Sequence, residues 1–304
     1  MAKEARQRDS LLAKANYLKL IAADLADSMK NGGFSSLYKG QGMEFAGVRE
    51  YIRGDDVRTI DWNVTARMSR PYVKQFEETR ELQFFTILDA SYSMQILDRG
   101  KTKYDAAAEA GAILALAAEM NSCPAGAVLF DGEIYFSCKP RLNKNQTMQM
   151  ITEMDRLPAR QNTGSALASA ITGAGKLLGS HSVVCIFSDF RAAPETWEKP
   201  LISLSQKNEV FAFRMNSPQD AALPSIGNAV FKDVESGTEV ELPSSSQEFR
   251  KKFKTYNQDQ ITKWKAFCIS HNVRPVVFDI TKEPLSVLDA AFKENRHGGT
   301  RWAK

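Results

Sequence analysis

The residues that build many catalytic and metal centres are scarce in this sequence: its 304 residues include three histidines and four cysteines. The histidines lie in three different segments with no pair at helical spacing, so a histidine-based metal site or nucleophile is not expected. The cysteines form no CxxC pair and are expected to be buried free thiols rather than disulfides or zinc ligands. They are Cys123, Cys138, Cys185 and Cys268.

Long apolar runs and a strong net charge are also absent. The most apolar stretch near the N-terminus, Leu18 to Leu25, is interrupted by Lys19 and Asp24 and is not expected to act as a signal peptide or to span a bilayer. The 40 Lys and Arg residues against 36 Asp and Glu leave a formal charge of +4, too small to indicate nucleic acid as the main partner. We therefore expect a cytoplasmic protein without a membrane span.

Apolar runs of strand length alternate with helical patterns through most of the chain. The runs predict strands at 82–88, 125–130, 133–138, 182–187, 210–215 and 274–278. Helices are expected at 104–120, 145–156, 165–178, 247–270 and 285–293, and we assign the aromatic stripe of the helix at 247–270 to the core. Asp131 and Gly132 predict a hairpin and hence one antiparallel edge strand. The pattern indicates an α/β fold with a doubly wound, mostly parallel sheet.

The chain divides into three expected parts: an N-terminal α+β extension at 1–80 packed on the main domain, the main domain at 81–294, and a basic, flexible tail at 295–304. Apolar residues at alternating steps of four and three predict an amphipathic opening helix. They are Leu11, Ala15, Leu18, Ala22, Leu25 and Met29. Further along, Asp56 is expected to cap a short helix, and 71–76 to form a strand.

Oxygen-bearing side chains follow two of the expected strands, at 82–88 and 182–187, and precede the helix expected at 165. In an open parallel sheet, ligands bind outside the carboxyl ends of the strands. Carboxylates and hydroxyls that leave coordination positions open suit Mg²⁺ or Mn²⁺, with water or a partner's carboxylate completing the shell. The predicted metal ligands are Asp89, Ser91, Ser93, Thr163 and Asp189.

This spacing resembles the metal-ion-dependent adhesion site of von Willebrand factor A domains, and the strand order from 82 to 278 is similar to that Rossmann-like fold. The resemblance implies that the two serines bind the metal directly, and that the threonine and the aspartates bind it directly or through water. Asn162 and Phe190 stand where glycine is frequent in those domains, which reshapes the rim without removing a ligand. Four rim residues are expected to set specificity: Tyr92, Gln161, Asn162 and Phe190.

An upstream stretch resembles the signature of the bacterial family called domain of unknown function 58. Its segments are Gly42–Tyr51, Gly54–Trp62, Ala66–Arg67 and Val73–Glu78. Members are commonly encoded beside MoxR-type AAA+ ATPases, and the family is interpreted as a partner in chaperone-like assembly. The resemblance implies a non-enzymatic adaptor that uses Mg²⁺ to capture an acidic residue of a protein partner.

Two alternatives remain open at this stage. The Asp-x-Ser-x-Ser motif is also typical of turns and helix caps that bind no metal. A Mg²⁺-dependent phosphatase would use Asp89 as its nucleophile. Such enzymes resemble an Asp-x-Asp pattern in which the second aspartate is the general acid, and this chain has Ser91 at that position.

Overall fold

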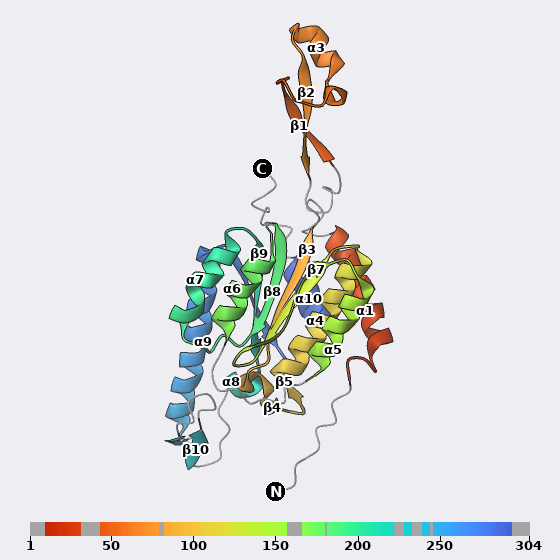
Figure 1. The fold of residues 1–304 in the computed structure, drawn as a ribbon. Coiled ribbons are helices and arrows are strands. Elements are labelled where there is room, and N and C mark those ends of the chain that lie inside the picture. Colours follow the sequence, from red (N-terminus) through yellow and green to blue (C-terminus); the bar gives the residue numbers. More distant parts are fainter. Residues whose placement is uncertain are drawn as a thin grey trace.

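The computed structural model describes residues 10–31, 43–78, 82–156, 166–179, 181–221, 228–232, 239–243 and 246–293. At its centre is a six-stranded sheet with the order β12-β9-β8-β3-β6-β7 (Figure 1). Neighbouring strands are parallel except for β7, which pairs antiparallel with β6 at the edge and confirms the predicted hairpin. The strands are β3 (Gln83–Asp89), β6 (Ala125–Phe130), β7 (Ile134–Arg141), β8 (Ser182–Ser188), β9 (Glu209–Asn216) and β12 (Val273–Asp279).

Helices cover both faces of this sheet, so the predicted doubly wound α/β architecture is confirmed (Figure 1). One face carries α1 (Ala15–Asn31), α4 (Lys103–Met120), α5 (Lys144–Asp155) and α10 (Pro284–Lys293). The other carries α6 (Leu167–Leu177), α7 (Pro194–Ser205) and α9 (Gln247–Ser270). Each face has its own apolar core, as expected for a sheet buried on both sides.

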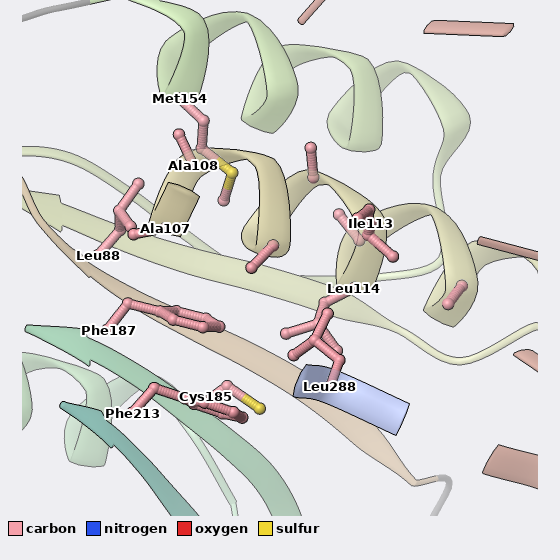
Figure 2. Close-up of a cluster of buried hydrophobic side chains, with 14 of the residues drawn as sticks. Leu88, Ala107, Ala108, Ile113, Leu114, Met154, Cys185, Phe187, Phe213 and Leu288 are labelled. Carbon is pink, nitrogen blue, oxygen red and sulfur yellow. The ribbon is translucent and has the colours of Figure 1, made fainter. Parts of the chain in front are cut away.

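Helix α4 lies in the middle of the first core and is buried almost all round. Leu88, Phe187 and Phe213 approach it from the sheet, and Met154 from α5 (Figure 2). Its outer side is covered by α1, whose predicted apolar stripe is buried except at the partly exposed Ala15. The small side chains of α4 allow this close approach, so α1 forms a third layer on the sheet.

The chain order places the carboxyl ends of β3 and β8 at a topological switch point. From β3 the chain crosses through α4 to β6 on one side, and it returns through α5 and α6 to β8 on the other side of β3. Small elements lie at this end: η2 (Tyr92–Gln95), β4 (Leu97–Asp98), β5 (Lys101–Thr102) and α8 (Pro218–Ala221).

Strands β1 (Met43–Glu50) and β2 (Tyr72–Glu78) form a separate antiparallel hairpin that also carries η1 (Val57–Thr59) and α3 (Trp62–Met68). We call residues 43–78 the arm. Figure 1 shows that it extends away from the end of the sheet where β3 begins, whereas α1 lies against the main body. The expected division of the chain, with the segment at 1–80 packed on the main domain, stays a prediction.

The arm contains little apolar core of its own within its described side chains. Val73 is 2% exposed, whereas Ile52, Val57, Trp62 and Met68 are each more than half exposed. Polar contacts support it instead: Asp56 caps η1 as predicted. Asp55 accepts two hydrogen bonds from the Arg49 guanidinium, at 2.6 and 2.7 Å, which lower the pKa of Asp55 to about 2.

The remaining expectations from the sequence have different outcomes. The aromatic stripe of α9 is only partly core: Trp264 is buried, but Tyr256 is 61% exposed because the first half of α9 runs past the sheet. Strands β10 (Asn228–Lys232) and β11 (Glu239–Pro243) form a separate antiparallel pair. The four cysteines are free thiols as predicted, and Cys138 alone is only partly buried. The tail at 295–304 lies outside the described residues.

Candidate metal centre

The structure brings four of the five predicted ligands together at the carboxyl ends of β3 and β8. Asp89 is the last residue of β3, and Ser91 and Ser93 belong to the turn into η2. Asp189 directly follows β8, and all four side chains are buried. The fifth predicted ligand, Thr163, lies outside the described residues, as do the rim residues Gln161 and Asn162.

These positions follow from the hydrophobic pattern of the two strands. Leu88 pairs with Phe187 in neighbouring parallel strands, so the residues that come next in each chain emerge at the same edge of the sheet. At that edge the Ser188 hydroxyl donates to Asp89 Oδ2 at 2.6 Å, linking the two strand ends.

Asp89 is held on both sides by hydrogen-bond donors. The Ser91 N–H donates to Asp89 Oδ1 at 2.8 Å. The hydroxyls of Ser91 and Ser93 lie 3.2 Å apart, beside the carboxylate. Within the residues that the structure describes, Asp89 has no ion-pair partner.

Asp189, in contrast, has a cationic partner that the sequence pattern did not indicate. Lys103, the first residue of α4, is 2% exposed, and its ammonium donates to Asp189 Oδ2 at 2.7 Å. The same nitrogen lies 3.4 Å from Asp220 Oδ2, and Arg191 Nε lies 3.6 Å from Asp189 Oδ2. No local signal shows that a lysine in the first turn of one helix contacts an aspartate 86 residues away.

The pKa values of the two buried aspartates are shifted in opposite directions. Burial, together with repulsion from Asp189, raises the pKa of Asp89 to about 7, because the hydrogen bonds from Ser188 and Ser91 only partly offset these two effects. Burial also acts to raise the pKa of Asp189. There the charges of Lys103 and Arg191, with hydrogen bonds from Lys103 and Ser93, outweigh it and lower the pKa.

A small pocket opens beside Asp189. It is lined in part by Arg191, Arg214, Asp220 and Asn257. Arg191 also pairs with Asp220, and burial lowers the pKa of the Arg214 guanidinium, which lies near Asp189. Of the four predicted ligands that the structure describes, Asp189 lines this pocket.

The chemistry of the donors on the Asp89 side fits a hard divalent cation. A carboxylate and two hydroxyls without a positive partner offer oxygen ligands and a charge that remains to be neutralised. In the described ranges no three side chains of His, Cys, Asp or Glu are grouped to hold a metal, so two serines have to supply part of the donor set. Metal binding by Asp89, Ser91, Ser93 and Asp189 stays a prediction.

Phe190, which follows Asp189, has a left-handed backbone with φ +52°. That conformation suits glycine and strains a bulky residue. Its ring is buried against Trp197 and Trp264, with centroids 5.4 and 5.3 Å away. Aromatic packing holds the rim of the site in this strained turn.

Comparison with known proteins gives a family but no activity. The model of the family described as "Protein of unknown function DUF58" matches residues 47–263. The chain is 30% identical over 228 residues to the uncharacterised protein Rv1480 of Mycobacterium tuberculosis, a match that covers 75% of this chain and 72% of the relative. The uncharacterised protein Mb1516 of Mycobacterium bovis matches with the same identity and coverage.

Two solved structures resemble the chain more distantly. One is an aerotolerance-related membrane protein from Bacteroides fragilis, with a TM-score of 0.47 and 16% identity. The other is the conserved hypothetical protein BatB from Bacteroides thetaiotaomicron, with a TM-score of 0.45 and 14% identity. Each match covers 70% of this chain and 98% of the other. Within the described part of this chain, no helix combines the length and apolar character needed to cross a membrane.

Proposed function

The chain belongs to the DUF58 family, and we propose that it is a non-enzymatic adaptor whose von Willebrand factor A-like domain binds Mg²⁺, or Mn²⁺, and captures an acidic side chain of a protein partner. Asp89, Ser91 and Ser93 would hold the ion, with Asp189 and Thr163 completing the ligand set directly or through water. The bound metal would supply an open coordination position for the partner's carboxylate.

The observation that supports this proposal is the state of Asp89. A buried carboxylate beside two hydroxyls, without an ion-pair partner among the described residues, is costly unless it is protonated or meets a cation. A divalent ion is a hard acid that suits these oxygens. The hydrogen bonds from Ser91 and Ser188 hold the carboxylate in one orientation, ready for the ion.

The partner class comes from the family resemblance. We propose a MoxR-type AAA+ ATPase, or its client, as the protein captured at this site.

The free thiols support a reducing compartment, and we place the protein in the cytoplasm. We also propose that it is not an enzyme, because Ser91 occupies the place of the second carboxylate that the phosphatase mechanism would need as its general acid.

Asp89→Asn tests the metal site because it removes the charge and keeps the shape of the side chain. We expect it to weaken Mg²⁺ binding, measured by isothermal titration calorimetry, by more than the roughly 10–100-fold that loss of an outer-shell partner costs. The matched control is Asp259→Asn, which removes an exposed carboxylate on α9.

A pull-down from the native organism then tests the partner. The wild-type chain in Mg²⁺ is expected to capture proteins, an AAA+ ATPase among them, that are lost in EDTA and with Asp89→Asn. Capture that is indifferent to both changes contradicts metal-bridged binding. Mg²⁺-dependent hydrolysis of a phosphate ester that Asp89→Asn abolishes would replace the adaptor with a phosphatase.

A further inference from the structure

We propose that Lys103 is a built-in competitor for the metal: its ammonium is the resident cation of the site, and a divalent ion binds fully only when that ammonium moves from Asp189 to Asp220. Lys103 thereby sets the Mg²⁺ concentration at which the site fills. This inference rests on the proposed function.

The burial of Lys103 is the first observation. Lysine is almost never fully buried unless it is paired, and desolvating its charge is expensive. Here the side chain is 3% exposed and its nitrogen contacts a carboxylate that is 5% exposed. Lys103 is also the first residue of α4, where the helix dipole disfavours a positive charge. The Asp189 contact offsets both costs.

The charge balance of the cluster is the second observation. Three carboxylates, Asp89, Asp189 and Asp220, face three basic groups. The basic groups are Lys103, Arg191 and Arg214. When Asp89 is ionised, the formal charges of these six groups balance, so a divalent ion would add two positive charges close to a buried ammonium. Mutual repulsion at such short range is large in a poorly solvated site. Metal and ammonium therefore compete for Asp189.

Asp220 provides a place for the displaced ammonium. Its Oδ2 already lies 3.4 Å from Lys103 Nζ, against 2.7 Å for Asp189 Oδ2, so rotation of the flexible end of the side chain can exchange the two contacts. The Ser217 N–H donates to the same Oδ2 at 2.9 Å and keeps the carboxylate in position. The side chain of Asp220 is 18% exposed, which lowers the cost of carrying the charge there.

Calorimetric titration of the full chain with Mg²⁺ tests this competition in Lys103→Met, which keeps the length of the side chain and removes its charge. We expect Mg²⁺ to bind on the order of ten-fold more tightly than in the wild type, or tighter still. The control is Lys101→Met, which removes a lysine two residues away that pairs with Glu109 at 3.7 Å instead of entering the site. Its affinity is expected to match the wild type.

A second variant covers the case in which Lys103→Met fails to fold. Asp220→Asn retains the hydrogen-bond acceptor for Ser217 but removes the charge that receives the ammonium, so Mg²⁺ binding is expected to weaken. Most of this effect should vanish in the double variant with Lys103→Met, because no ammonium then needs a new partner. Asp220→Asn with unchanged or tighter Mg²⁺ binding overturns the inference.

The outcomes separate this inference from the proposed function. Equal Mg²⁺ affinity in the wild type and in Lys103→Met overturns the role of Lys103 and leaves the metal site standing. Tight binding by Lys103→Met with none by the wild type supports the competition and rejects metal bridging in the native protein. Absence of Mg²⁺ binding in both overturns both.

Discussion

Among single residues, Phe190 shows most directly how the rim of the site is maintained. Its left-handed backbone is unfavourable for any residue except glycine, and its ring is the compensation, since it fills the space between Trp197 and Trp264. The turn that orients Asp189 therefore depends on aromatic packing instead of on the conformational freedom of glycine.

Substituting Phe190 separates these two contributions. Phe190→Ala loses the packing and keeps the backbone strain, so we expect a loss of about 3–5 kcal/mol in the free energy of unfolding. Phe190→Gly loses the same ring but relieves the strain, and should be more stable than Phe190→Ala by about 1 kcal/mol. Urea denaturation of both variants measures the difference; an alanine variant as stable as the glycine variant would contradict strain at this position.

The candidate site could be predicted from sequence only where neighbours along the chain determine position. Asp89 and Asp189 each follow an apolar run, and parallel strands bring such residues to one edge of the sheet. Lys103 and Asp220 could not be predicted, because their approach to Asp189 depends on how α4 and α8 pack at the strand ends, which no local pattern encodes.

Among the elements, the β6–β7 pair shows how closely the edge of the sheet is packed. A Cβ atom on Gly126 of β6 would lie 2.7 Å from the Cys138 carbonyl oxygen and 2.7 Å from the Pro140 nitrogen. Both are backbone atoms of β7, which cannot give way without moving the strand. Gly111 in α4 differs, because a Cβ there meets the flexible Met154 side chain at 3.1 Å.

The same substitution at these two glycines is therefore expected to have different effects. Gly126→Ala should lower the free energy of unfolding by about 3 kcal/mol or more through overpacking. Gly111→Ala should change it by no more than about 1 kcal/mol, since the gain in helix propensity offsets the adjustment of Met154. Denaturant unfolding measures the free energy of unfolding of both variants. A loss in Gly126→Ala as small as the one in Gly111→Ala would show that the β6–β7 contact is not rigid.

Sequence periodicity predicted the central strands and, except for α7, the helices on the sheet, because each has a buried face of regular spacing. It predicted less where an element leaves the body of the sheet. The aromatic residues of α9 have the spacing of a core stripe, yet Tyr256 lies beyond the edge of the sheet that would cover it. Strand β1 was not predicted, because its charged and glycine residues lack a continuous alternation.

For the molecule as a whole, the arm and the candidate site lie at opposite ends of β3. The seven residues of β3 separate them by about 23 Å at the usual rise per residue.

Met43 pairs with Glu78 at the base of the arm, so residues 44–77 can be replaced by an Asn-Gly hairpin turn. We expect this variant to keep its Mg²⁺ affinity and the thermal unfolding temperature of the remaining chain, by calorimetry. A loss of Mg²⁺ binding would show that the arm supports the site.

The position of β3 also has a mechanical consequence. Strand β2 of the arm leads into β3 along the chain, so the part of a pull on the arm that passes through β2 acts on the start of β3. Strand β3 is bonded to β6 on one side and to β8 on the other along its length. Such a pull therefore loads both ladders of hydrogen bonds in shear and together, rather than opening them one bond at a time. The strand that carries Asp89 is therefore anchored on both sides against tension from the arm.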